Sequence, residues 1–280
     1  MKLDILICTY NERIAQVPAM LLPFRPDISY IVSIQYTEKR CLRQIPEELQ
    51  TRRDVKLLFL EGIGLSRNRN HALQAATADV ALIADDDCRY TADYFDRILS
   101  VFEAHPEVDI AQFMLHTATH DPIKPYPSRT CPYENRPKGL YPSSMELAFR
   151  VGRLKNRILF NEHFGLGTKI LICGEEEVWL HDAVQAGFSV WFFPYYIVDA
   201  PYESTGKRAY TDKGVMRAKG AVNYHLFGAS AWLRMVKFAL IGACQHKASF
   251  FLLLFQSWYG IIYYLNHCRT HENTVVRRSE

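Results

Sequence analysis

Short hydrophobic runs alternate with longer amphipathic stretches through most of the chain. The runs are rich in β-branched and aromatic residues, as buried strands are. They lie at Leu3–Cys8, Tyr30–Ile34, Val55–Leu60, Val80–Ala84, Asp109–Leu115 and Val190–Val198. Helical spacing and capping residues between them predict helices, which are expected from Ser66 to about Ala76, from about Ala92 to Ala104, and from Glu175 to Gly187. This alternation predicts an α/β fold with a mainly parallel sheet covered on both faces.

Three segments are less regular. Glu38–Arg53 is charged and predicts either a helix or an irregular connection. His116–Pro142 contains six prolines, which is typical of a functional loop, so we expect it to lie over a cleft. For the residues that follow, a capping box at Ser143–Glu146 and a strand at Met145–Arg150 both fit the sequence.

From Ser230 to Cys268 the chain becomes strongly apolar and aromatic. Its longest uninterrupted stretch, Ala248–Leu265, has about the minimum length of a membrane-spanning helix. We favour two helices that lie in a membrane interface, with Trp232, Trp258 and several tyrosines at the depth of the headgroups. The alternative is a helical subdomain that packs on the core or on a second subunit.

Charge is distributed unevenly along the chain. The net charge is only +3 over 280 residues, so bulk composition does not indicate nucleic-acid binding. From Lys207 onward there are 11 Lys and Arg residues against 3 Asp and Glu residues, so the preceding part is net acidic. This asymmetry indicates a basic loop and tail that face phosphates or anionic lipid, with a solvated helix face as the alternative. We expect residues 1–205 to form the main domain and residues 206–280 to add the basic loop and the C-terminal helices.

Cysteine usage and the N-terminus bear on the compartment. The seven cysteines are scattered and include no CxxC pair. This pattern is typical of reduced thiols in a cytosolic protein and argues against a disulfide framework or a zinc site. The N-terminus enters a strand directly and has no signal peptide, so we expect a cytoplasmic protein.

Three consecutive aspartates, Asp85, Asp86 and Asp87, follow the apolar run Val80–Ala84. In open α/β sheets, ligands bind outside the carboxyl ends of the strands. Adjacent carboxylates repel one another unless a cation or hydrogen bonds offset their charge, and Mg²⁺ and Mn²⁺ favour carboxylates together with phosphate oxygens. The motif therefore predicts a site for Mn²⁺ or Mg²⁺, and an acidic turn with solvated carboxylates is the alternative.

Further polar clusters fit one cleft that binds a nucleotide-sugar and a metal. Thr9–Glu12 follows the first strand, where loop residues meet a base and a ribose. Arg69 lies near the start of a predicted helix, within reach of a diphosphate or of the aspartates. Gly174–Glu177 leads into another helix and places carboxylates where an acceptor hydroxyl can approach.

In these residues the sequence resembles the inverting family 2 glycosyltransferases of GT-A fold. The resemblance covers about residues 3–200 and depends on the order and spacing of several short motifs. These are Ile5–Glu12, Gly64–Asn70, Val80–Asp87, Arg89–Phe95, Phe160–Glu162 and Gly174–Gly187. It implies a Rossmann-like, mixed but mainly parallel sheet that binds a nucleotide-sugar, followed here by a C-terminal apolar helical segment.

The resemblance also implies roles on the nucleotide side of the cleft. Thr9, Tyr10 and Glu12 border the uridine pocket, and Arg69 lies beside the nucleotide. The second strand departs from the family pattern, because an aspartate-rich segment is replaced by Val32–Thr37. Gln35 in this segment is able to pair with uracil through its amide, and a surface role is the alternative.

For the metal and the catalytic step, the resemblance places Asp85 on the ribose side, Asp86 beside it and Asp87 at the metal. Glu176 takes the position of the catalytic carboxylate, and Glu175 is its main rival. Inverting transfer needs one general base for the acceptor hydroxyl, while a metal stabilises the departing diphosphate. The alternative for both glutamates is that acids are favoured at a helix N-terminus.

Together with these patterns, the resemblance implies a metal-dependent, inverting glycosyltransferase of hexosyltransferase type that uses a nucleotide-sugar, with UDP as the expected nucleotide. The expected acceptor is a glycan or glycolipid in bacterial surface polysaccharide synthesis, and the expected location is the inner face of the cell membrane. No nucleic-acid partner is expected. The alternatives are a catalytically silent scaffold of the same fold and a sugar-phosphate nucleotidyltransferase. The latter is disfavoured because no glycine-rich, arginine-containing loop follows the first strand.

Overall fold

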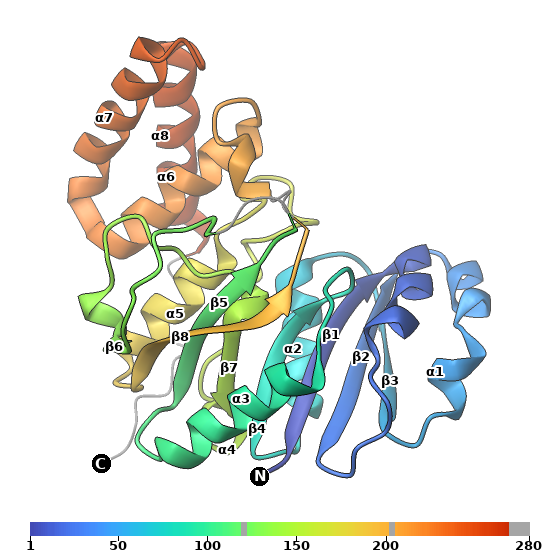
Figure 1. Cartoon of the computed structure of the whole chain (residues 1–280). Coiled ribbons are helices and arrows are strands. Elements are labelled where there is room, and N and C mark those ends of the chain that lie inside the picture. Colours follow the sequence, from blue (N-terminus) through green and yellow to red (C-terminus); the bar gives the residue numbers. More distant parts are fainter. Residues whose placement is uncertain (119–121, 202–204, 269–280) are drawn as a thin grey trace.

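A computed structural model describes residues 1–118, 122–201 and 205–268 (Figure 1). Its centre is an eight-stranded sheet with the strand order β3-β2-β1-β4-β7-β5-β8-β6. The strands are β1 (Leu3–Tyr10), β2 (Ile28–Tyr36), β3 (Val55–Glu61), β4 (Val80–Asp85), β5 (Ile110–His116), β6 (Cys131–Pro132), β7 (Leu147–Arg150) and β8 (Val190–Asp199). This mixed, mostly parallel sheet confirms the predicted fold class.

Helices connect and cover the strands. The α-helices are α1 (Glu47–Thr51), α2 (Leu65–Ala75), α3 (Ala92–Ala104), α4 (Val151–Leu154), α5 (Glu175–Gln185), α6 (Lys213–Phe227), α7 (Ala231–Cys244) and α8 (Phe250–His267). The 3₁₀ segments are η1 (Asn11–Met20), η2 (Lys39–Gln44), η3 (Tyr133–Asn135), η4 (Ser144–Glu146), η5 (Thr205–Arg208) and η6 (Gly228–Ser230).

The sheet is covered on both faces because its strands alternate their side chains. Along β1, Ile5 and Ile7 join one hydrophobic cluster and Leu6 and Cys8 join the other. The first cluster includes the buried face of α3, and the second includes residues of α2 and α5. Continuous apolar runs such as β4 are the expected sequence for strands buried on both sides.

Strand register brings the predicted motifs to one edge of the sheet. β1, β2, β3 and β4 are mutually parallel, and Cys8 pairs with Asp85 while Tyr10 pairs with Gln35. The loops that follow β1, β2 and β4 therefore emerge together. β7 pairs antiparallel with both β4 and β5, which sets η4 beside the end of β4.

Several local predictions are corrected by the structure. Ser66 does not cap α2, because Gly64 occupies the N-cap with φ of 135° and the Ser66 hydroxyl donates instead to the Phe164 carbonyl. His116, expected in a loop, ends β5. The proline-rich segment is not only a loop, since Cys131–Pro132 pairs with β8 at the edge of the sheet. His120 and residues 202–204 lie outside the described residues.

Both alternatives for the segment after the prolines are realised, one after the other. Ser143 and Glu146 form a capping box around η4, and β7 begins at Leu147. The charged segment after β2 likewise combines the two predictions, because it contains an irregular 3₁₀ stretch and the short helix α1. All seven cysteines are free.

After β8 the chain forms α6, α7 and α8, which pack on one another at one end of the molecule (Figure 1). α6 also contacts α5, so the helices adjoin the part of the sheet domain that follows Gly174. Within the described residues, one helical stretch, Lys213–Cys244, has the length and composition to cross a membrane, which is weak evidence for a span. It is not the stretch that the sequence indicated, because Ala248–Leu265 falls largely in α8.

Candidate functional site

Arg69 is the centre of a buried polar cluster. It lies in the second turn of α2. The first turn of this helix is fixed by a hydrogen bond from the Leu65 backbone N–H to the Leu166 carbonyl at 2.8 Å. The Arg69 side chain is almost fully buried and lies below the carboxyl end of the sheet. A buried guanidinium needs partners for its donors, because an unpaired buried charge is costly.

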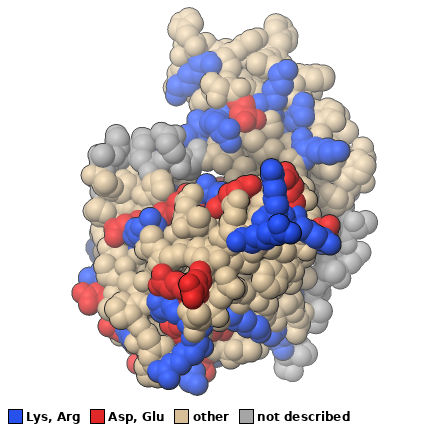
Figure 2. Space-filling model, turned by 90° about the vertical axis from the view of Figure 1, so that its right-hand side faces the viewer, with Lys and Arg blue, Asp and Glu red and all other residues tan. Residues whose placement is uncertain are grey.

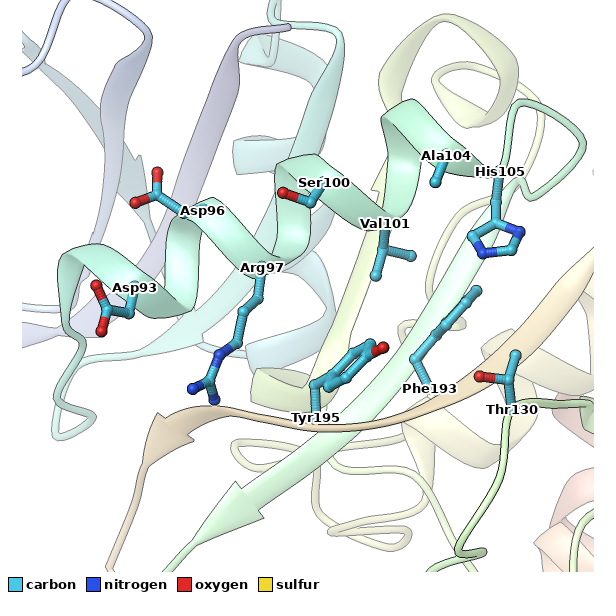
Figure 3. A pocket seen from close by; sticks show the side chains of 10 residues that line it. All are labelled: Asp93, Asp96, Arg97, Ser100, Val101, Ala104, His105, Thr130, Phe193 and Tyr195. Carbon is cyan, nitrogen blue, oxygen red and sulfur yellow. The ribbon is translucent and has the colours of Figure 1, made fainter.

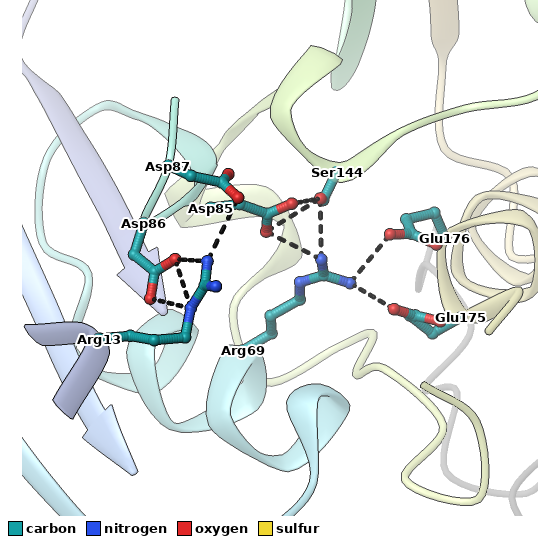
Figure 4. Close-up of polar contacts among 8 residues, drawn as sticks. All are labelled: Arg13, Arg69, Asp85, Asp86, Asp87, Ser144, Glu175 and Glu176. Atoms are coloured by element: carbon teal, nitrogen blue, oxygen red, sulfur yellow. Dashed lines mark hydrogen bonds and ion pairs between the residues drawn. The ribbon is translucent and has the colours of Figure 1, made fainter. Parts of the chain in front are cut away.

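Those partners come from three separate elements (Figure 4). Nη1 donates to Glu175 at 2.9 Å and to Glu176 at 3.0 Å, both at the start of α5. Nη2 donates to Asp85 at 3.2 Å and to the Ser144 hydroxyl at 2.8 Å. One guanidinium thus joins the end of β4 to the first turn of α5.

The electrostatics of this cluster follow from burial and from the crowding of carboxylates. Burial alone lowers the pKa of Arg69, but Glu176, Asp85 and Glu175 together raise it above its ordinary value. Burial also raises the pKa of Glu175, and the neighbouring Glu176 carboxylate raises it further. Glu175 Oε2 has no hydrogen-bond partner among the described residues. Glu176 is the more accessible of the two, with 17% of its side chain exposed against 5% for Glu175.

A second arginine lies against the other two aspartates. Arg13, in η1, donates through Nε to both oxygens of Asp86 at 3.0 Å, and through Nη2 to Asp87 at 3.2 Å (Figure 4). The Thr9 hydroxyl also donates to Asp86 at 2.7 Å. Asp86 is therefore buried and fully bonded, whereas 39% of the Asp87 side chain is exposed.

Asp85 and Asp87 are the carboxylates that suit a cation brought by a ligand. Both are partly exposed, and burial together with Asp85 and Asp86 raises the pKa of Asp87. Burial is the main cause of that shift, and the two neighbouring carboxylates add to it. The partly exposed oxygens of Asp85 and Asp87 are of the kind that a divalent cation takes together with phosphate oxygens. Among the described residues, no group of three or more His, Cys, Asp and Glu side chains is arranged to hold a metal ion.

The loops after β1 and β2 are tied together near the residues expected at the nucleoside. Asn11 adopts φ of 50° and accepts a hydrogen bond from the Thr37 N–H at 3.0 Å. The Tyr10 hydroxyl lies 3.1 Å from that of Thr37, and Glu12 accepts a bond from the Cys41 thiol. Gln35 is a buried residue of β2, and its Nε2 has no hydrogen-bond partner among the described residues.

Two further residues with metal-ligating side chains lie apart from this cluster. Asp199 lies at the end of β8, where its Oδ1 is 3.2 Å from His116 Nδ1 and accepts a hydrogen bond from the Tyr94 hydroxyl at 3.2 Å. His163 contacts the ring of Tyr263. Neither bonds to the aspartates or to Arg69 in the part of the chain that the structure describes.

Sequence reasoning missed Arg13 and Ser144. Arg13 directly follows the Thr9–Glu12 motif, but nothing in its spacing indicates that it reaches back to the aspartates. Ser144 lies between Arg69 and Asp85, to which its hydroxyl donates at 3.3 Å. Its capping box was recognisable, and that box is what holds η4 in place.

A buried ion pair between Lys124 and Glu146 fixes the 3₁₀ segment η4, which contains Ser144. Lys124 donates to Glu146 at 2.8 Å and to the Ser143 hydroxyl at 2.7 Å, and both charged side chains are essentially inaccessible. The Ser143 N–H and the Tyr126 hydroxyl also donate to Glu146. These bonds tie the start of the proline-rich segment to its end, next to the Arg69 cluster.

A separate hollow lies away from this cluster. A space of about 510 Å³ lies between α3 and β8 (Figure 3). Its lining includes Asp93, Asp96, Arg97, His105 and Tyr195, and none of the residues predicted for the site. The hollow therefore does not alter the assignment of the site to the carboxyl edge of the sheet.

The chain is similar to known proteins in sequence and in fold. A sequence profile described as glycosyl transferase family 2 matches residues 4–165. The fold is similar to that of TarS residues 1–349 from S. aureus in complex with UDP-GlcNAc, with a TM-score of 0.60 and 14% sequence identity over 95% of this chain and 92% of that chain. The complex of TarS 1–349 with UDP gives a TM-score of 0.55 and 17% identity over 87% of this chain and 72% of that one.

A longer TarS structure gives a TM-score of 0.55 and 16% identity, with 85% of this chain aligned to 43% of that chain. The chain therefore spans less than half of that longer protein. At these identities the likeness shows the fold alone. No curated protein matches the chain.

Proposed function

The chain belongs to glycosyl transferase family 2, as its motifs predicted, and we propose that this glycosyltransferase moves one sugar from a UDP-sugar to a hydroxyl group, with inversion at the anomeric carbon. The observation that carries the proposal is the bridge made by Arg69. It joins Asp85, at the strand end where nucleotides bind in such folds, to Glu176, the candidate base. The residues that bind the donor and the residue that activates the acceptor would then both contact the buried guanidinium of Arg69.

Glu176 is the general base in this proposal. It takes the proton of the acceptor hydroxyl while the acceptor oxygen forms a bond to the anomeric carbon. The bond from that carbon to the diphosphate oxygen breaks at the same time, and UDP leaves with the electron pair. Glu176 suits the role better than Glu175 because its carboxylate is more accessible, whereas Glu175 is buried behind it.

Asp87, with Asp85, would hold Mn²⁺ or Mg²⁺ in the donor complex. A divalent cation there supplies charge stabilisation for the departing diphosphate. Arg13 is a positioning residue, because it neutralises Asp86 and holds Asp87 in place from the exposed side. Arg69 orients the Asp85 carboxylate from the buried side.

The nucleoside is proposed to lie over the ends of β1 and β2. Gln35 offers a buried amide N–H whose partner is missing among the described residues, and a uracil carbonyl would accept its bond. Thr9, Tyr10 and Glu12 line the adjoining loop. The TarS complexes with UDP and UDP-GlcNAc support a UDP-sugar as donor, by likeness of fold.

The acceptor is proposed to be a glycan or glycolipid of a bacterial surface polysaccharide, and the sugar a hexose. Family membership supports the class of acceptor, and the apolar C-terminal helices support an enzyme that works at the inner face of the cell membrane. The basic residues Lys207, Arg208 and Lys213 precede these helices and suit a phosphate-bearing acceptor.

A second candidate is a catalytically silent protein of the same fold. It is favoured by one observation, which is that Asp85, Asp86 and Asp87 are each already bonded to an arginine. Release of UDP separates the two functions, and a thermal-shift assay tests the donor binding that the enzyme requires. With Mn²⁺ present, a panel of UDP-sugars should raise the melting temperature, since a ligand that binds only the folded state stabilises it. If no nucleotide-sugar of any base changes it, the enzyme proposal is contradicted.

A further inference from the structure

α8 presents a continuous stripe of apolar side chains to solvent. The apolar stripe consists of Phe251, Phe255, Trp258 and Ile262, spaced so that they share one face of the helix. Exposed fractions reach 78% at Phe251, 65% at Phe255 and 51% at Ile262. The helix sequence Phe250–His267 contains no Asp, Glu, Lys or Arg. Large exposed apolar surfaces on a folded domain mark interaction sites.

The stripe cannot turn inward, because the opposite face of α8 is fixed against α6. The two helices cross where Gly220 meets the Ser257 carbonyl and Gly260 meets the Arg217 carbonyl, so closely that an added Cβ would lie about 2 Å from each oxygen. Gln256 adds a hydrogen bond from Arg217 Nε at 2.7 Å. The buried face is thus committed, and the stripe remains outside.

α7 extends the apolar surface with an amphipathic face. Leu233, Lys237 and Leu240 are exposed and share a face of the helix, and Leu233 is 77% exposed. The ring of Trp232 contacts that of Trp258 at 5.6 Å, so the start of α7 adjoins the stripe. A lysine amid exposed leucines can extend its ammonium group to a charged interface while its stem contacts apolar groups.

Charge around these helices is strongly one-sided. Residues 205–268 contain eight Lys and Arg and a single acidic residue, Asp212. In Figure 2 the charged residues on the helical part, at the top of the view, are mainly Lys and Arg. A second copy of this chain would bring like charges together, whereas an anionic surface would complement them.

We propose that the apolar stripe and the exposed face of α7 dock the protein on the surface of an anionic lipid bilayer. The helices lie in the plane of the interface, with Phe251, Phe255 and Leu233 entering the acyl boundary and Lys237 at the headgroups. This deepens the membrane placement proposed above, because it names the surface and the lipid charge.

Vesicle flotation of the full chain, without donor or acceptor, tests the proposal independently of catalysis. The wild type should float with phosphatidylglycerol-containing vesicles and much less with pure phosphatidylcholine vesicles. Phe251→Ser/Phe255→Ser should weaken binding by about tenfold or more. Phe59→Ser, which removes another exposed aromatic side chain from β3, should bind like the wild type. Cooperative thermal unfolding followed by far-UV circular dichroism confirms that each variant is folded.

Lys237→Glu provides a second test that leaves the apolar stripe intact. It should reduce flotation with phosphatidylglycerol vesicles, since it reverses a charge beside the stripe. Wild-type protein that fails to float, or stripe variants that float equally well, would overturn the proposal. So would light scattering that shows a wild-type dimer which the double substitution converts to monomer, because the stripe would then be a subunit interface.

Discussion

Arg69 donates to Glu176 at 3.0 Å, and this bond joins the helix that carries the candidate base to the strand that carries the aspartates. The contact has a direct consequence for the chemistry. A change on the donor side of the cluster alters the charge that the base experiences, because both share one buried guanidinium. Donor binding and the orientation of the Glu176 carboxylate should therefore be coupled.

Glu176→Gln should lower the rate constant of transfer by roughly a hundredfold to ten-thousandfold, because the amide keeps the shape of the side chain but not its basicity. Donor affinity should change little. Initial rates with saturating donor, beside calorimetric binding of the nucleotide, measure the two effects separately. Glu175→Gln is the matched comparison. If Glu175→Gln is inactive and Glu176→Gln is not, the base is Glu175.

Asp87→Asn should abolish the dependence of donor affinity on Mn²⁺, because it removes the more exposed carboxylate of the cluster. Calorimetric titration of UDP with and without the metal measures that dependence, and chelation by EDTA should mimic the substitution in the wild type. Asp93→Asn, at an exposed aspartate on α3, is the control and should behave as the wild type. Unchanged Mn²⁺ dependence in Asp87→Asn would remove this residue from the metal site.

Stability should depend on pH through Glu175. Burial raises the pKa of this carboxyl above its ordinary value of 4.5, so the folded state holds its proton more tightly than the unfolded state. Its contribution to the free energy of unfolding is fully present below the unfolded pKa and is lost as the pH rises through the higher folded pKa. Urea denaturation from about pH 4.5 upward should show that the free energy of unfolding falls less with pH in Glu175→Gln than in the wild type. Glu134→Gln, at an exposed glutamate, should retain the wild-type slope.

Gly260→Ala should destabilise the packing of α8 on α6 by about 1–3 kcal/mol, because its Cβ would overlap the Arg217 carbonyl. Gly152→Ala is the matched control in α4, where an added Cβ meets nothing within 4 Å among the described residues. There the same substitution should be neutral or stabilise the helix by about 0.5–1 kcal/mol. Hydrogen exchange in α8 locates the effect, and equal protection in Gly260→Ala and wild type would contradict the close crossing.

Much of the fold was predictable because its signals are local. The apolar runs of β1, β2, β3 and β4 and the spacing in α3 and α5 contain their own evidence of burial and period. The position of Asp85 at a strand end followed from the same pattern. The prediction that Ser66 caps α2 was wrong because Ser66 and Gly64 both satisfy local capping rules. The choice was made by a distant acceptor, the Phe164 carbonyl.

The rest of the site depends on contacts between residues far apart in sequence. Arg13 reaches Asp86 across 73 positions, and Ser144 reaches Asp85 across 59. The hydrophobic periodicity of a sequence does not predict contacts between residues so far apart. The edge strand β6 was missed for a related reason, since two residues in a proline-rich segment give no strand signal until β8 lies beside them.

Release of UDP from a panel of UDP-sugars in the presence of Mn²⁺ tests the central claim most directly. The wild type should release UDP from at least one donor when a glycan or glycolipid acceptor is supplied. Glu176→Gln should bind that donor and release almost none. Wild-type protein that releases no nucleotide with any donor and acceptor, or Glu176→Gln that releases it at the wild-type rate, would contradict the account.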